Sequence, residues 1–431
     1  MGLVDVVVYG LIYMVPLAPL AVFGFVYNFS GGMVAGVYAV AAVAMYFSAV
    51  SYSEMAQEFP VAGSVYSYVR FGAGEFLGFI SGWSILLDYL LLPGLLCIFA
   101  AAAMHAQVPA LPAWVWVPVF VLVSTVINLR GITFTARVNL ACLYVQLGVL
   151  VMFVAAVIAA VLAGRVHLSW EPFVGHGRFS FAPIFAALPI AALSYIGFDA
   201  ISTLNEEAKG GGKAVARATM IVLFAVAVLF ILQVYLAALF VPRGTKFDAD
   251  SAVTAFYDIA AVAAGAVFKA IITLTSALIA ILANAIVSQA TTSRLIFSMA
   301  RDRQIPGFLA VVDRRRKVPV RAVLLVAVLS TGIGLVAINS SDLITSMVTF
   351  GSLTAYCLLH VAVMQYFAGQ NERLRWFAHR VSPLLGLAIL VYALWKTQEL
   401  ARMVGVIWLA AGAVIYWIHA RRGHSKTSRG M

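Results

Sequence analysis

The sequence predicts an all-α integral membrane protein with about twelve transmembrane helices. Of its 431 residues, 63% are hydrophobic and only 10% are charged, and the mean hydropathy is +1.00. A water-soluble domain with this composition would expose too much apolar surface. The apolar residues form long runs and not short alternating strands, which favours helices over a barrel. No polar segment is long enough to fold outside the bilayer, so residues 1–431 are interpreted as one polytopic domain.

The expected spans follow one another closely, and each supplies roughly 20 residues for a hydrocarbon core of about 30 Å. Trp114 and Trp116 open the fourth span and Trp417 lies near the end of the twelfth, as is typical of interface anchors. We place the spans at 6–27, 33–57, 77–104, 113–128, 137–163, 183–204, 217–241, 263–298, 319–338, 343–367, 381–397 and 403–420.

The distribution of positive charge predicts the orientation. With the N-terminus inside, about 21 of the 28 Lys and Arg residues fall in cytoplasmic loops and ends. This asymmetry predicts a multi-pass protein of the plasma (inner) membrane with both termini in the cytoplasm. It also explains the net charge of +11 without a nucleic-acid partner, because the "RRRK" run at 314–317 is typical of a topology signal that contacts lipid headgroups.

The sequence predicts neither a cysteine framework nor a processed N-terminal leader. The three cysteines, Cys97, Cys142 and Cys357, fall inside predicted spans and are odd in number, so we expect neither a disulfide framework nor a metal site. The first apolar run lacks a preceding basic region, and Val6 stands where a myristoylation signal has Ser or Thr. We therefore expect no cleaved or lipidated leader.

Two spans are interrupted at corresponding positions. The first reads "YGLIYMVPLAPLAVFGFVYN", and its Pro16 and Pro19 predict a break near Met14–Pro19, because each proline removes a backbone donor. The sixth span has Gly197 in its middle. Breaks in spans 1 and 6 predict an inverted repeat of 1–163 and 183–367, followed by two extra helices at 381–420. The alternative is that the prolines only kink the first helix and the glycine only permits close packing.

Broken helices near the bilayer midplane are typical of secondary transporters. Freed amides favour a carboxylate, and freed carbonyls favour an ammonium or another cation. We expect the substrate to be bound by Tyr13, Met14, Val15, Pro16, Leu17 and Ala18 at the first break and by Leu193, Ser194, Tyr195, Ile196, Gly197 and Phe198 at the second.

Four stretches resemble permeases of the amino acid–polyamine–organocation superfamily, nearest to its putrescine-importer-like and amino acid permease branch. They are "SYSEMAQEFPVAGSVYSYVR" (51–70), "GFISGWSILLDYLLLP" (78–93), "IGFDAISTLNEEAKG" (196–210) and "SRLIFSMARDRQIP" (293–306). The resemblance implies a five-plus-five inverted repeat, alternating access, and transport of amino acids or amines that is usually driven by protons.

Asp88 is an acid in the middle of the third span, with apolar neighbours on both sides. A carboxylate at this depth costs about 3 kcal/mol unless it is neutral, paired or facing a wet cavity. We therefore expect Asp88 to carry a coupling proton or to bind a substrate ammonium. The alternative is a buried hydrogen bond to a neighbouring helix.

Two positions depart from the patterns of the resembling proteins. Gln146 stands where some proton-coupled members have a lysine that exchanges protons, and a glutamine cannot titrate, which strengthens Asp88 as the proton site. Ala21 stands where the putrescine-importer-like pattern tends to have an acid, so a substrate with one amine or an amino acid is favoured over a diamine. With Asn284 and Ser288, Gln146 is interpreted as a polar site of spans 5 and 8; polar packing is the alternative.

Several polar residues are expected to act at the cytoplasmic end. Asp199 is interpreted as a cap of the second half of span 6, and Glu206 and Glu207 as gate residues that form ion pairs in one state only. A solvated helix end is the alternative for the two glutamates. Phe198 is either a gate over the substrate or core packing. For His360 we weigh a proton relay against a hydrogen bond between helices.

The sequence as a whole predicts a proton-coupled symporter that imports a small amino acid or amine, with the substrate and the lipid bilayer as partners and no cofactor besides the coupling ion, H⁺. An exchanger or facilitator without proton coupling and a non-transporting nutrient sensor of the same fold are the alternatives. An enzyme is not expected and no catalytic residue is assigned, because HExxH, GxSxG and a suitably spaced aspartate pair are missing from the sequence. Monomer and homodimer both remain open.

Overall fold

The computed structural model of the chain describes residues 2–61, 64–130, 132–175, 179–205, 208–301, 306–313, 318–370 and 374–427. These residues are helical apart from loops and one isolated antiparallel bridge between Asp313 and Val318. Ten of the described helical stretches are long and apolar enough to cross a membrane, and Ala113–Leu129 and Val320–Val336 are shorter apolar helices. The all-α membrane class is confirmed, and the count of twelve spans stays a prediction.

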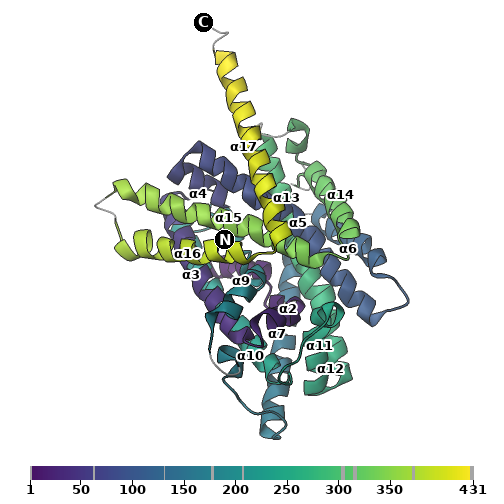
Figure 1. Cartoon of the computed structure of the whole chain (residues 1–431). Helices are drawn as coiled ribbons and strands as arrows, with labels where there is room; N and C mark the ends of the chain where they lie inside the picture. The colour runs from purple at the N-terminus through teal and green to yellow at the C-terminus, as the bar shows by residue number, and fades with distance from the viewer. Residues whose placement is uncertain are drawn as a thin grey trace.

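The helices follow one another along the chain with short connections (Figure 1). They are α1 (Leu3–Met14), η1 (Ala18–Ala21), α2 (Phe23–Ser30), α3 (Val34–Glu58), α4 (Ser64–Ala73), α5 (Glu75–Gln107), α6 (Ala113–Leu129), α7 (Ile132–Leu162), α8 (Glu171–Val174), α9 (Phe181–Tyr195), η2 (Phe198–Leu204), α10 (Gly211–Ala238), α11 (Ala249–Ala264), α12 (Ala266–Leu274), η3 (Thr275–Ile281), α13 (Leu282–Arg301), η4 (Gly307–Ala310), α14 (Val320–Val336), α15 (Ser341–Tyr366), η5 (Phe367–Gly369), η7 (Phe377–Val381), α16 (Ser382–Lys396) and α17 (Glu399–Thr427).

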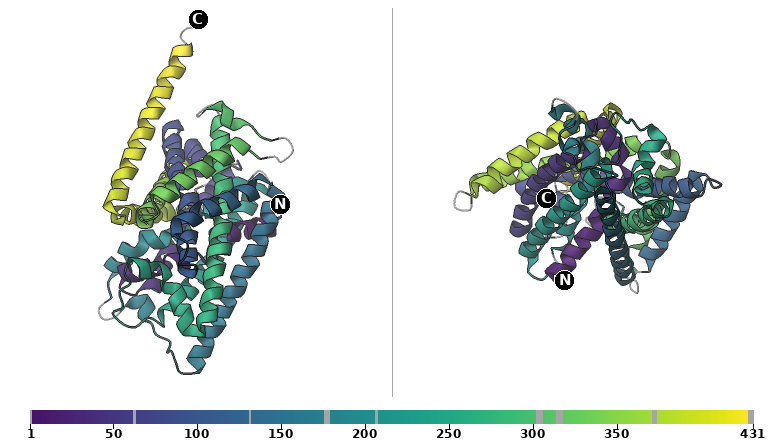
Figure 2. Two further views of the ribbon diagram at one scale, coloured as in Figure 1. Left: turned by 90° about the vertical axis from the view of Figure 1, so that its right-hand side faces the viewer. Right: turned by 90° about the horizontal axis from the view of Figure 1, so that it is seen from below.

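Besides the four-residue α8, the described residues contain two longer α-helices that the sequence did not predict, α4 and α11. With 10 and 16 residues they are shorter than a membrane span, so a search for long apolar runs misses them. The eighth predicted span, 263–298, is α12 and α13 joined by the π-helix η3. The last helix, α17, begins earlier and continues further than the predicted 403–420, and it projects away from the other helices (Figure 2).

The central helix of the bundle is α5. It packs against α4, α6, α13, α14 and α15, and 83% of its candidate membrane span is buried, compared with 17% for α17. On another side, α3 packs against α9, α10 and α16. A side chain that projects from α5 can therefore contact several helices at once, which makes α5 the natural element for a buried functional residue.

Both predicted helix breaks are present. The first helix ends at Met14, Val15 has a φ of 50°, and the chain resumes as the 3₁₀-helix η1. Gln233 of α10 donates a 2.9 Å hydrogen bond to the carbonyl of Pro16 and so satisfies a group that the break leaves free. The sixth span ends as α9 at Tyr195 and resumes as the 3₁₀-helix η2.

Gly197 serves both purposes that the sequence allowed for it. Its φ of 124° lies in the region that favours glycine, and it permits the turn between α9 and η2. A Cβ atom at this position would also lie 2.5 Å from Cδ1 of Tyr13, so the glycine lets the two broken helices approach each other. The breaks are thus adjacent in space and not only similar in sequence.

Candidate functional site

A small cavity of about 60 Å³ lies beside the two breaks, with room for a few water molecules. Seven of the residues predicted to bind substrate or to form the polar site line it: Val15, Leu17, Ala18, Leu193, Ser194, Ile196 and Asn284. Ala21, which stands where the putrescine-importer-like pattern tends to have an acid, also lies in the lining. The cavity is thus lined by residues of both interrupted segments, and substrate binding there stays a prediction.

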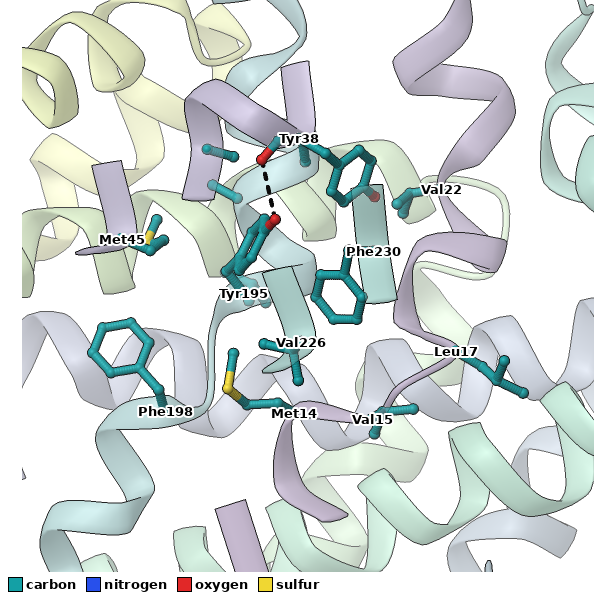
Figure 3. Close-up of a cluster of buried hydrophobic side chains, with 14 of the residues drawn as sticks. Met14, Val15, Leu17, Val22, Tyr38, Met45, Tyr195, Phe198, Val226 and Phe230 are labelled. Carbon is teal, nitrogen blue, oxygen red and sulfur yellow. Dashed lines mark hydrogen bonds between the residues drawn. The ribbon is translucent and has the colours of Figure 1, made fainter. Parts of the chain in front are cut away.

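Other residues predicted at the breaks form the packing around the cavity and not its lining (Figure 3). Met14, Tyr195 and Phe198 are buried in the hydrophobic core. The Tyr195 hydroxyl donates a 3.0 Å hydrogen bond to the carbonyl of Tyr38, and its ring lies edge-on to Phe230 at 5.0 Å between centroids. These contacts hold the end of α9 against α3 and α10.

Tyr13, Pro16 and Gly197 are also outside the lining. Tyr13 packs on Gly197, and the carbonyl of Pro16 is bound by Gln233. Their positions keep the two breaks together, and direct contact with a substrate stays a prediction for each of them.

The sequence did not predict the wall that α5 contributes. Leu92, Leu95, Leu96 and Phe99 line the cavity at the spacing i, i+3, i+4 and i+7, which places them on one face of the helix. That stripe is readable in the sequence, but in an apolar span every face carries such residues. Position relative to the breaks, which only the fold supplies, distinguishes this face from the others.

Three polar side chains line the cavity, and two of them have partners. The Ser194 hydroxyl lies 2.9 Å from the Tyr38 hydroxyl, and the hydroxyl of Ser276, in η3, lies 2.9 Å from that of Tyr257. The third, Asn284, has a buried Oδ1 atom without a hydrogen-bond partner among the described residues. This oxygen can accept a hydrogen bond from a bound molecule.

Asp88 lies on α5, one helical turn before Leu92, and its side chain is fully buried. Its Oδ2 accepts a 2.5 Å hydrogen bond from the Ser352 hydroxyl of α15. The other oxygen, Oδ1, has no partner in the described part of the chain. A Cβ atom on Gly351 would lie 2.7 Å from the Ser84 carbonyl, so this glycine allows α15 to come close enough for the Ser352 contact.

Asp199 is the second buried carboxylate near the breaks. Its Oδ2 accepts a 2.8 Å hydrogen bond from the Tyr89 hydroxyl of α5, and its Oδ1 accepts a 3.1 Å bond from the Tyr356 hydroxyl of α15. Asp199 lies in the first turn of η2, so its position is compatible with a cap of this helix, and the capping role stays a prediction. The two tyrosines are functional candidates that sequence reasoning missed.

An aromatic cluster lies beside Asp199 and includes Tyr356, which donates to its carboxylate. The Phe198 ring lies 5.4 Å from both the Tyr52 and the Tyr356 ring, and those two rings are 5.7 Å apart and nearly perpendicular. Phe198 is fully buried. The interpretation as core packing describes its position in this structure, and a gating movement stays a prediction.

The polar residues expected in spans 5 and 8 do not form one hydrogen-bonded site. Gln146 and Ser288 are buried, and the Gln146 Oε1 and Ser288 Oγ atoms lack partners among the described residues. Their neighbour Gln289 instead joins α13 to α6, because it accepts from Asn128 and donates to Thr125 at 2.9 and 2.8 Å. Gln289 is therefore polar packing, and the roles of Gln146 and Ser288 stay predictions.

The last candidates from the sequence are His360 and the two glutamates of the expected cytoplasmic gate. His360 lies between two serines of α3, with its ring nitrogens 3.2 Å from Ser48 and 2.9 Å from Ser51. The hydrogen bond between helices, weighed above against a proton relay, is thus present. Glu206 and Glu207 lie outside the described residues.

A partly buried ion cluster that the sequence did not suggest joins α3 to η7 and to the exposed Arg375, which lies just before η7. Glu54 accepts from Arg375 and, at 2.9 Å, from His379, whose ring is stacked on Phe367 at 3.6 Å between centroids. It lies at the opposite end of α3 from the loop after α2, and its residues do not line the cavity.

Comparisons with known proteins agree with this architecture and with the resemblance noted in the sequence. The model of the amino acid permease family matches residues 5–429. The low-affinity putrescine importer PlaP of Escherichia coli (strain K12) is 32% identical over 424 residues, which cover 96% of this chain and 91% of the relative.

Two Bacillus subtilis (strain 168) proteins are also similar. The branched-chain amino acid permease BcaP is 30% identical, covering 91% of this chain and 86% of the relative. The methylthioribose transporter is 26% identical, covering 89% and 85%. The chain therefore belongs to the amino acid permease family, and it is a multi-pass membrane transporter and not an enzyme.

Proposed function

We propose that this permease is a secondary active transporter that imports a small amino acid or amine by alternating access, and that Asp88 carries the coupling proton. The single observation that carries the proposal is a buried carboxylate, with one oxygen unpartnered among the described residues, one helical turn from a cavity between two broken helices. The names of the relatives, which specify putrescine and branched-chain amino acids, support amines and amino acids as the substrate class.

The proposed coupling follows from the surroundings of Asp88. No salt bridge to Asp88 or Asp199 is present in the described part of the chain, so neither negative charge is neutralised by a basic side chain. Two tyrosine hydroxyls donate hydrogen bonds to Asp199, one to each carboxylate oxygen, whereas the Ser352 hydroxyl donates to one oxygen of Asp88. The other oxygen of Asp88, Oδ1, has no partner among the described residues and is free to carry a proton, which supports Asp88 as the coupling site.

The proposed transport cycle uses the breaks as the moving parts. The two interrupted helices meet at Tyr13 and Gly197, and in this proposal the interruptions let one half of each helix move relative to the other half. In this proposal 1–163 and 183–367 are the inverted repeats, and both termini face the cytoplasm. Asp88 takes up its proton from outside and loses it after the site opens inward.

The experiment is uptake by the purified protein in liposomes under an imposed inward proton gradient, with radiolabelled amino acids and amines tested singly. We expect the gradient to raise uptake several-fold for the wild type. In Asp88→Asn, uptake should no longer respond to the gradient, while exchange of internal for external substrate continues. The control is Asp258→Asn on α11, because Asp258 is an exposed acid paired with Lys269 at 2.5 Å and should respond as the wild type does.

The other outcomes identify the alternatives. An equal response to the gradient in Asp88→Asn would show that Asp88 is not the proton site. If the wild type exchanges substrate but its uptake does not respond to the proton gradient, the exchanger or facilitator is favoured. If it binds substrate without uptake or exchange, the sensor is favoured.

A further inference from the structure

The cavity has an apolar wall opposite the breaks. Leu92, Leu95, Leu96 and Phe99 of α5 are each at most 7% exposed, and they lie on one face of a helix whose membrane span is 83% buried. This wall cannot move far, because α5 is surrounded by other helices. A group of the substrate that faces α5 is therefore in contact with hydrocarbon only.

The polar groups of the cavity are few and uncharged. The lining, all of it within the described residues, contains no acidic or basic side chain. The hydroxyls of Ser194 and Ser276 already have tyrosine partners, which leaves the Asn284 amide as the side-chain group available to a ligand. One carboxylate and one ammonium group can be recognised by the Asn284 amide and by the free amides and carbonyls of the breaks, but a second cation would have no counter-charge.

The nearby acids do not supply that counter-charge. Neither Asp88 nor Asp199 lines the cavity, and both are buried and bonded to serine or tyrosine hydroxyls of α5 and α15. An ammonium placed against the leucines would lose its water without gaining a partner, and burial of an unpaired charge is strongly unfavourable.

We propose that this cavity selects a neutral amino acid with an apolar side chain and rejects diamines. The α5 residues Leu92, Leu95, Leu96 and Phe99 form the subsite for the apolar side chain, and Ala21 is the position where the absence of a charge excludes a second ammonium. The inference rests on the proposed function, because it names the substrate class of the same site. Hydrophobic pockets discriminate between side chains that differ by one methylene by about 10- to 200-fold.

The first test is equilibrium binding to the full-length protein purified in detergent. The probes are valine, leucine, isoleucine, phenylalanine, lysine, glutamate and putrescine, each measured by displacement of whichever labelled probe binds. We expect at least one of valine, leucine and isoleucine to bind ten or more times tighter than putrescine and lysine. Putrescine binding equal to or tighter than that of every aliphatic amino acid would overturn the inference.

The second test changes the charge of the wall. Ala21 is a small, partly exposed residue of η1 that lines the cavity, so Ala21→Asp places a carboxylate there. We expect this variant to bind putrescine at least ten times tighter than the wild type and aliphatic amino acids more weakly. Ala21→Ser, which adds a polar group without charge, is the matched control. Equal putrescine affinity in the two variants, both with wild-type thermal unfolding, would contradict the charge argument.

The third test changes the size of the apolar subsite. Phe99→Ala should shift the order of affinity towards phenylalanine by about tenfold or more relative to valine. Phe120→Ala removes a buried phenylalanine of α6 that is outside the lining, so it should lower stability but keep the wild-type order. The same order of affinity in both variants would show that Phe99 does not determine specificity.

These outcomes separate the two proposals. If no probe binds and none is taken up, the proposed function fails and this inference fails with it. If uptake is proton-coupled as proposed but putrescine is the preferred ligand, only the inference about substrate class is overturned.

Discussion

The hydroxyl of Tyr89 on α5 donates a 2.8 Å hydrogen bond to Oδ2 of Asp199 on η2. Because Tyr356 of α15 donates to the other oxygen of the same carboxylate at 3.1 Å, Asp199 connects three helices. Thr292 of α13 donates to the backbone carbonyl of Tyr89 at 2.7 Å and adds a fourth. The second half of the broken helix therefore cannot tilt away from α5 and α15 without exchanging these hydrogen bonds for others.

The first prediction concerns this carboxylate. Tyr89→Phe and Tyr356→Phe each remove one donor from a buried carboxyl group, so each should lower the free energy of unfolding by about 1–3 kcal/mol. Thermal unfolding in detergent measures the loss, and both variants should also shift the equilibrium between outward- and inward-open states, read out as a change in uptake relative to binding. Tyr144→Phe, at a position 67% exposed on α7, is the control.

A loss of stability in Tyr89→Phe no larger than that in Tyr144→Phe would contradict this role of Asp199. A loss of stability without any change in the ratio of uptake to binding would mean that the hydrogen bonds only hold the fold and do not control the movement of η2.

The site residues that could be predicted from the sequence are those that disturb their own helix. Pro16, Gly197 and Asp88 were found because each is a local anomaly: a missing donor, a residue without a side chain, or a charge in an apolar run. The effect of such a residue on its own helix can be deduced without knowing its neighbours, and both helix breaks lie where the sequence predicted them.

The missed residues are ordinary in their own helices. Tyr89 and Tyr356 are 110 and 157 positions from Asp199, and Ser352 is 264 positions from Asp88. Which faces of which helices meet depends on tertiary packing, for example on Gly351, and a single sequence carries no signal of these pairings. The polar residues of span 8 illustrate the same limit, since Asn284 lines the cavity whereas Gln289, five residues on, faces α6.

The second prediction concerns the turn between α9 and η2. Gly197→Ala introduces a side chain at a φ of 124° and a Cβ atom 2.5 Å from the Tyr13 ring. We expect a loss of about 1–3 kcal/mol in the free energy of unfolding, and weaker substrate binding because the two breaks move apart. Gly332→Ala is the matched control, since that glycine lies within α14 and a Cβ atom there would meet nothing within 4 Å.

In the control, the added methyl group should leave stability unchanged or raise it by up to about 1 kcal/mol, because alanine favours a helix more than glycine does. Similar unfolding temperatures and similar substrate affinities for the two variants would show that the close approach of Tyr13 and Gly197 is not required.

The third prediction concerns the attachment of α17. The Trp83 and Trp408 rings are stacked at 4.6 Å between centroids, and each Nε1 donates a 2.8 Å hydrogen bond to the backbone carbonyl of the other residue. A Cβ atom on Gly412 would lie 2.4 Å from Cδ1 of Trp83, so the glycine makes room for the pair. Because most of α17 is exposed, this reciprocal pair holds the helix to α5.

Each single change, Trp83→Phe or Trp408→Phe, removes one donor and most of the ring overlap, and we expect the two to be coupled. A double-mutant cycle on thermal unfolding should give a coupling free energy of about 0.5–3 kcal/mol, and hydrogen exchange of the α17 amides should become faster in every variant. Trp376→Phe, at a position 71% exposed, is the control for loss of an indole. Strictly additive effects would mean that the tryptophans contribute separately, in which case α17 is held mainly by its packing on α15 and by the contacts of Tyr416 with Phe76 and Phe79 of α5.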